Sequence, residues 1–114
     1  MVGVAGSGGA DACARAELAR LPGDGSGTVV LRLRGEVDIS SVPVLQPELD
    51  RALADAPDSI AFDLADLDFM DSSGIALLLG AAHRVGAVEL RNASTPIRRL
   101  IELSGLSDIL RVAS

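Results

Sequence analysis

Residues 71–74 of this chain combine an acid, two hydroxyls and a glycine, a set of side chains suited to chemistry. They read Asp71-Ser72-Ser73-Gly74 and stand where an extended segment meets a strongly apolar one. A serine at such a junction lies at a helix N-terminus, where free backbone N–H groups and the helix dipole favour an anion. A phosphate added there brings about −1.5 to −2 charges. The stretch therefore indicates either an anion-bearing serine or a plain helix N-cap, for which Ser and Asp are favoured on structural grounds alone.

Ser72 and His83 are the residues of this sequence that could form the serine–histidine pair of a hydrolase. His83 is the only histidine, and a helix that begins near Ser73 puts it on the order of 15 Å from Ser72. The G-x-S-x-G turn that carries the serine of many hydrolases is also absent. We therefore expect no catalytic residue, and we expect His83 at the surface in the last helical turn, where it suits the helix dipole.

Four aspartates crowd the stretch before the helix, at Asp63, Asp66, Asp68 and Asp71. Such a cluster is found in divalent-cation sites and in receiver domains, which are phosphorylated on aspartate. A receiver also needs a lysine across its pocket, and all ten basic residues of this chain are arginines. The spacing fits no calcium-binding loop. We therefore expect a solvated acidic rim and no bound metal.

Composition bounds the size and the partners of the protein. The 114 residues suit one domain, and a hydrophobic fraction of 48% is enough for a core. Sixteen acidic residues against ten basic ones give a net charge of −6, which argues against nucleic acid as a partner. The longest apolar run, Ile75–Leu79, is too short for a membrane span. The absence of lysine removes P-loop and Schiff-base chemistry, and we expect no cofactor.

The cysteine content and the first residues indicate the compartment and the domain boundary. A single cysteine, Cys13, cannot form an internal disulfide. Residues 1–10 carry neither a basic residue nor a long apolar stretch, unlike a signal peptide. We therefore predict a cytoplasmic protein. Residues 1–11 are rich in glycine and are predicted to form a flexible tail, and residues 12–114 to form the folded domain.

Periodic hydrophobic residues predict strands that alternate with helices. Val29, Leu31 and Leu33 recur at every second position, which is strand periodicity. The predicted strands span 13–21, 28–35, 59–64 and 87–91, the predicted helices begin near residues 41–43, 73 and 95, and a short element over 106–112 closes the chain. Phe69 and Met70 are expected to be buried, and Pro47 to distort the first turn of its helix. This alternation predicts an α/β fold.

Three stretches can be matched, in order and in spacing, to a known family. They are 33–38 (LRGEVD), 69–74 (FMDSSG) and 96–106 (PIRRLIELSGL). They resemble a strand ending in Gly-Glu-Leu-Asp, an Asp-Ser-Ser/Thr-Gly phosphorylation motif and a helix ending in Ser-Gly-Leu of the STAS domain family, and within it of the bacterial anti-sigma factor antagonists. The resemblance covers residues 28–112. It leads us to expect a single STAS domain, with a four- to five-stranded mixed sheet covered by about four helices.

The resemblance also implies a phospho-switch. In that family the unmodified antagonist binds an anti-sigma factor and frees the sigma factor for transcription. The anti-sigma factor is also an ATP-dependent serine kinase that phosphorylates the first serine of the motif, and a phosphatase reverses the reaction. The match assigns phosphorylation to Ser72 and places Asp38 beside it, where we expect it to serve recognition rather than stability. The predicted partner-binding residues are Asp38, Asp71, Ser72, Ser73 and Gly74, the last leaving room for another molecule to approach the backbone.

The implied protein is thus a bacterial, cytoplasmic phosphoprotein that regulates transcription through protein–protein contacts, without catalysis, cofactor, metal or direct contact with nucleic acid. An anti-sigma factor serine kinase and a serine phosphatase are its expected partners, and the protein is expected to be a monomer or a weak dimer. A second interpretation stays open: a STAS interaction module in a lipid-transport or scaffold complex, in which Ser72 is not phosphorylated.

Overall fold

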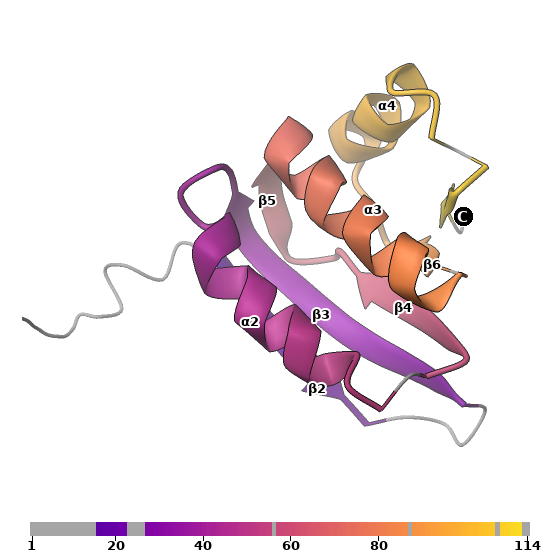
Figure 1. Cartoon of the computed structure of the whole chain (residues 1–114). Coiled ribbons are helices and arrows are strands. Elements are labelled where there is room, and N and C mark those ends of the chain that lie inside the picture. The colour runs from indigo at the N-terminus through magenta and orange to yellow at the C-terminus, as the bar shows by residue number, and fades with distance from the viewer. Residues whose placement is uncertain (1–15, 23–26, 56, 87, 107, 113–114) are drawn as a thin grey trace, which may run out of the picture.

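Strands and helices alternate along this chain, as the hydrophobic pattern predicts. The structure, a computed structural model, describes residues 16–22, 27–55, 57–86, 88–106 and 108–112. Its elements, labelled in Figure 1, are β2 (Ala16–Leu21), β3 (Thr28–Val37), α2 (Val42–Ala52), β4 (Ser59–Asp63), β5 (Leu67–Met70), α3 (Ser72–Val85), β6 (Val88–Arg91), α4 (Thr95–Leu103) and β7 (Leu110–Val112). The expected α/β class is confirmed.

One mixed sheet of six strands organises the molecule, and β3 pairs with three of the other strands. The strand order is β2-β3-β4-β6-β7, and β5 pairs with β3 beside this path. The pairing of β2 with β3 is antiparallel, and β3 pairs in parallel with both β4 and β5. Because parallel neighbours need a crossover, a helix connects β3 to β4 and another connects β6 to β7. β5 extends the sheet beyond the end of β4, at the edge where the site is built.

The strand and helix counts correct our expectation. We predicted four to five strands and about four helices, whereas the described ranges hold six strands and three helices. The strand that we missed is β5, which lies in the aspartate-rich stretch that we interpreted as a rim. Aspartate is disfavoured in strands, but pairing with β3 outweighs this preference. The predicted closing element is a strand, β7.

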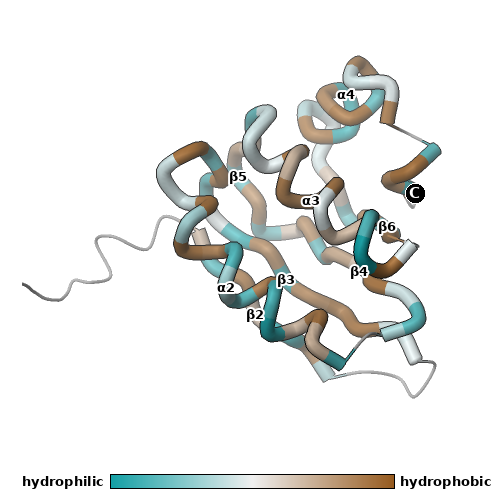
Figure 2. The backbone as a smooth tube through the Cα atoms, viewed as in Figure 1, coloured by the Kyte–Doolittle hydropathy of each residue, from teal (hydrophilic) through white to brown (hydrophobic). Residues whose placement is uncertain are grey.

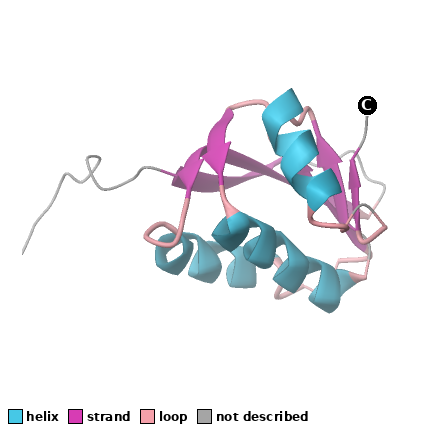
Figure 3. Cartoon of the chain, turned by 90° about the horizontal axis from the view of Figure 1, so that it is seen from above, coloured by secondary structure: helices cyan, strands magenta, loops and turns pink. Residues whose placement is uncertain are grey.

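Most of the core lies between the sheet and the pair of helices α2 and α3, and α4 adds Ile97 and Ile101 to it. Figure 3 shows these two helices side by side on one side of the strands, with α4 apart from them. Val29, Leu31 and Leu33 point into this core and are buried, while Arg32 and Arg34, which alternate with them, are more exposed. In Figure 2 the hydrophobic residues of β3 and β4, coloured brown, accordingly lie on the part of the sheet that α2 and α3 face. The predicted alternation along β3 is therefore confirmed.

Two sequence expectations concern the ends and the bends of the chain. The predicted tail, residues 1–11, lies outside the described residues, as do the first residues of the strand predicted over 13–21. Helix α2 runs on through Pro47, which stands inside it. None of the helices in the described ranges is both long and apolar enough to cross a membrane.

Candidate functional site

The site forms where β3 and β5 end side by side. In the parallel pairing of these strands Val37 is the partner of Met70, so the next residues, Asp38 and Asp71, leave the sheet at the same edge. The Asp71 backbone N–H donates to the Val37 carbonyl oxygen at 3.2 Å, which ties the two chain segments together. The loop after β3 and the start of α3 meet at this edge (Figure 1). The predicted neighbours Asp38 and Asp71 are thus brought together by strand register.

Asp71 is the N-cap of α3. Its backbone is extended, and its carboxylate Oδ1 accepts a hydrogen bond of 2.8 Å from the Ser73 backbone N–H. Its own carbonyl accepts from the N–H groups of Gly74 and Ile75. Of the serines and the aspartate that we considered as the N-cap, the aspartate performs this function. This arrangement leaves both serine hydroxyls outside the capping bonds.

Ser72 and Ser73 differ in exposure. Ser72, the first residue of α3, is exposed, and its hydroxyl makes no hydrogen bond within the part of the chain that the structure describes. Ser73 is half-buried, and its N–H is held by Asp71. An enzyme that modifies this turn from solvent therefore reaches the Ser72 hydroxyl more easily than that of Ser73.

Gly74 is buried, and its missing side chain serves packing within the chain. A Cβ atom at this position would collide with Cγ of Met70, and would lie 3.1 Å from Cγ1 of Val37. The first turn of α3 can approach β5 and β3 closely only because residue 74 has no side chain. We expected this glycine to leave room for a partner; in the structure that room is filled by Met70 and Val37.

Asp38 holds the loop between β3 and α2. Its Oδ1 accepts hydrogen bonds from the Ser40 N–H at 3.0 Å, the Ser40 hydroxyl at 2.6 Å and the Ser41 N–H at 3.2 Å. In return the Ser41 hydroxyl, which is buried, accepts from the Asp38 N–H at 2.9 Å. We expected a helix to begin near Ser41 but did not predict its hydrogen bonds with Asp38, although an aspartate followed by serines two and three residues later is typical of such a turn. Asp38 is therefore structural as well as a candidate for recognition.

Two large apolar side chains at this edge face solvent. Ile39 is 78% exposed in the loop after Asp38, and Phe69 is 49% exposed on β5. Our expectation that Phe69 is buried is wrong: its neighbour Met70, which points to the other face of the strand, takes the inward position. Exposed apolar side chains beside a candidate switch residue are suited to contact with a partner.

The residues of the alternative chemistries do not assemble. His83 is exposed in the last turn of α3, as predicted, at the opposite end of the helix from Ser72. Asp63 accepts bonds from the Ala65 N–H and the Asn92 side chain. Among the described residues, no three or more His, Cys, Asp or Glu side chains form a group able to hold a metal ion. The site therefore offers a hydroxyl at a helix start in acidic surroundings.

Comparison with known proteins gives consistent matches. The family described as "Mlab, STAS domain" matches residues 23–111. The Anti-sigma-B factor antagonist of Bacillus subtilis (strain 168) is 31% identical over 90 residues, which are 75% of this chain and 82% of that protein. The Anti-sigma F factor antagonist of Lysinibacillus sphaericus is 37% identical over 84 residues, 69% of this chain and 72% of that protein.

Solved structures match the fold as well. The anti-sigma factor antagonist SpoIIAA in its unphosphorylated form superimposes with a TM-score of 0.69 at 29% identity, covering 86% of this chain and 89% of that one. The Bacillus SpoIIAA in the phosphorylated form superimposes with a TM-score of 0.64 at 29% identity, covering 86% of this chain and 92% of that one.

Proposed function

The chain belongs to the STAS domain family, and from this premise we propose that it is an anti-sigma factor antagonist controlled by phosphorylation of Ser72. Unmodified, it binds an anti-sigma factor that is also a serine kinase and so frees a sigma factor for transcription. Phosphorylated, it releases that partner, and a serine phosphatase restores it. It acts in the cytoplasm as a binding protein without catalysis of its own. The names of its relatives support the antagonist function.

The observation that carries this proposal is the exposed Ser72 hydroxyl at the first residue of α3. Asp71 already supplies the capping bond, so modification of Ser72 removes no hydrogen bond that the helix start uses. A phosphate at this position is close to the positive end of the helix dipole, which favours an anion. The domain is thus able to accept the phosphate without rearrangement.

Release of the partner follows from charge. Asp38 and Asp71 already carry negative charge at this edge, and phosphate adds about −1.5 to −2 more. A partner surface shaped for the unmodified edge must then bury a dianion without a matching cation. Such burial costs several kcal/mol, and a loss of 3–4 kcal/mol weakens affinity roughly 10²- to 10³-fold. SpoIIAA keeps this fold in both of its phosphorylation states, which supports a switch that acts through the interface.

The direct test is to map the phosphate. The protein is incubated with its anti-sigma factor kinase and ATP, and the modified residue is identified by mass spectrometry. We expect one phosphate, on Ser72, and none on Ser72→Ala. Ser73→Ala is the matched control, and we expect it to be modified like the wild type. Modification of Ser73 with Ser72→Ala still fully phosphorylated would overturn the assignment.

The switch itself is tested by binding. Unmodified protein is expected to bind the anti-sigma factor, and the phosphorylated form to bind roughly 10²- to 10³-fold more weakly. Tight binding by the phosphorylated form would contradict the proposed antagonist function. A chain that is never phosphorylated and binds components of a transport or scaffold complex would instead support the second interpretation.

A further inference from the structure

An open groove runs between β5 and α4, on the side of β5 away from β3. It encloses about 230 Å³, and we call it the β5–α4 groove. The apolar residues that line it are Phe69, Met70, Pro96, Ile97 and Leu100, joined by Ser94 at the start of α4. The volume exceeds that of one large aliphatic side chain. The groove is thus large enough to receive a side chain from another molecule.

The groove combines a buried floor with an exposed aromatic rim. Met70 and Ile97 are buried and belong to the core, whereas Phe69 beside them is 49% exposed. An aromatic side chain next to an apolar hollow is typical of the few residues that supply most of the energy at protein interfaces. Phe69 has no core function that explains its size at this position.

The charge at the groove selects the kind of partner. Asp68 is its one charged lining residue. It is exposed and, in the part of the chain that the structure describes, makes no ion pair. Asp66 is also exposed but lies outside the groove, in a neighbouring hollow that Asp68 shares with Arg32 and Arg34. A complementary partner therefore brings a lysine or arginine next to its apolar side chain.

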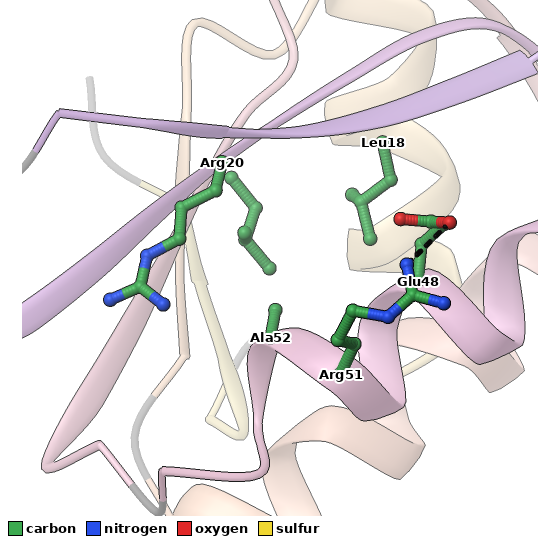
Figure 4. A pocket seen from close by; sticks show the side chains of 6 residues that line it. Leu18, Arg20, Glu48, Arg51 and Ala52 are labelled. Carbon is green, nitrogen blue, oxygen red and sulfur yellow. Dashed lines mark hydrogen bonds and ion pairs between the residues drawn. The ribbon is translucent and has the colours of Figure 1, made fainter.

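A second hollow, between β2 and α2, lacks these properties. It encloses about 200 Å³ and is lined by Leu18, Arg20, Glu48, Arg51 and Ala52, among others (Figure 4). Its charges are matched within the chain, because Arg51 pairs with Glu48 at 2.9 Å and Arg20 with Asp55 at 3.7 Å. Its charged side chains therefore already have partners, unlike Asp68 in the β5–α4 groove.

Position links the β5–α4 groove to the switch residue. Met70 on its floor is followed at once by the N-cap Asp71 and then by Ser72. We propose that the β5–α4 groove receives an apolar side chain of the anti-sigma factor, flanked by a lysine or arginine that pairs with Asp68. This inference rests on the proposed function and adds the part of the surface that holds the partner. A partner seated in the groove lies against the first turn of α3. Phosphate on Ser72 then adds a dianion that the partner's lysine or arginine, already paired with Asp68, does not neutralise.

Three substitutions test the groove in different ways. Phe69→Ala removes the aromatic rim, Ser94→Phe fills the groove, and Asp68→Lys reverses its charge. Ser94 makes no side-chain capping bond, so its replacement leaves the helix start intact. Two controls lie in the last turn of α4, outside the groove: Leu103→Ala, at a residue that is 87% exposed, and Glu102→Lys, which matches the charge change.

Thermal unfolding first shows that each variant is folded. The affinity of each variant is then measured for the purified anti-sigma factor kinase, from the same bacterium, that binds the wild type. We expect Phe69→Ala and Ser94→Phe each to weaken binding roughly 10- to 100-fold. Asp68→Lys is expected to weaken it roughly 10-fold and to reduce its dependence on salt. Both controls are expected to bind like the wild type.

The outcomes separate the two proposals. One outcome is that the wild type binds the kinase, that phosphorylation ends this binding, and that the three groove variants bind normally. The groove is then not the binding surface, and the proposed function stands. Equal losses in the variants and in the two controls would likewise overturn the groove, because the effect would not be specific to it. If no anti-sigma factor kinase binds the wild type, both proposals are overturned.

Discussion

Asp38 combines two properties that a substitution can separate. Its Oδ1 accepts three hydrogen bonds from Ser40 and Ser41, which hold the loop before α2. Its negative charge lies at the edge that we assign to the partner. From the sequence we expected its loss to leave stability nearly unchanged, and the hydrogen bonds change that expectation. An asparagine keeps an oxygen acceptor of the same shape while it removes the charge.

We therefore predict different effects for two variants of Asp38. Asp38→Ala should lower the free energy of unfolding by about 1 kcal/mol, because the part-buried Ser41 N–H and the two exposed donors of Ser40 lose this acceptor. Asp38→Asn should retain most of that stability. If the charge serves recognition, both variants bind the anti-sigma factor more weakly. Urea denaturation and a binding titration measure the two effects, and normal binding by a folded Asp38→Asn would limit Asp38 to a structural function.

Helix α3 contains two glycines in opposite environments. Gly74 is buried in the first turn, where an added Cβ would meet Met70 and Val37. Gly80 is exposed in the middle of the helix, and an added Cβ would meet nothing within 4 Å. Helix propensity favours alanine over glycine at both positions. Packing therefore decides the outcome at residue 74, and propensity decides it at residue 80.

The two alanine substitutions should accordingly have opposite signs. Gly74→Ala is expected to destabilise the fold by about 1–3 kcal/mol, because Met70 or the helix must move. Gly80→Ala is expected to stabilise it by about 0.5–1 kcal/mol. Chemical denaturation of the two variants beside the wild type measures both changes. A stabilising Gly74→Ala would mean that α3 does not pack on β5 as closely as described.

A polar contact joins α2 to α3 at the surface. Arg84 of α3 donates to Oδ1 of Asp50 on α2 at 2.5 Å, and the Gln46 side chain donates to the same oxygen at 3.0 Å. The hydrogen bond from Gln46, and then the bond and charge of Arg84, lower the pKa of Asp50 below its usual 3.8. Both partners are largely exposed, so solvent screens the pair and its contribution is small.

The pH dependence of this contact has a definite sign. Because the pKa of Asp50 is lower in the folded state, its contribution to stability is present above the unfolded pKa of about 3.8 and is lost as the pH falls through the folded value. We predict that Asp50→Asn is slightly less stable than the wild type at neutral pH. The difference should vanish in acid, which unfolding curves at both pH values would show. A difference in stability that persists in acid would show that the substitution acts through packing and not through the charge of Asp50.

At the scale of the whole molecule, the question is whether phosphate changes the fold or only one edge of it. The site is at the end of β3 and β5, and the core under α2 and α3 does not include the Ser72 side chain. The helix start is already capped by Asp71. A charge added at Ser72 is therefore expected to act locally.

Ser72→Asp tests this expectation, although it carries only about half the charge of a phosphate. We predict weak binding to the anti-sigma factor, unchanged secondary structure, and amide NMR shifts confined to the vicinity of Asp38 and to residues 71–76. Ser72→Asn is a control of similar size without charge. Shifts spread through the sheet would instead show that the switch rearranges the domain.

The sequence by itself determined the features that depend on neighbours along the chain. The alternation of Val29, Leu31 and Leu33 was predicted, and so was a helix start near residue 73, which the structure has at Ser72 directly after Asp71. Periodicity and capping involve residues a few positions apart, so a local pattern is enough to identify them. The motif around Ser72 was placed at the start of a helix by the same reasoning.

Only the tertiary structure decided the features that depend on the pairing of β3 with β5. That pairing makes a strand of the aspartate-rich residues 67–70, turns Phe69 outward and Met70 inward, and brings Asp38 beside Asp71. It also explains why residue 74 lacks a side chain, since α3 must pack closely on both strands. Partners some thirty residues apart set this register, and a one-residue slip would exchange the two faces of β5. No local pattern contains that choice, because it is made by the packing of the whole core.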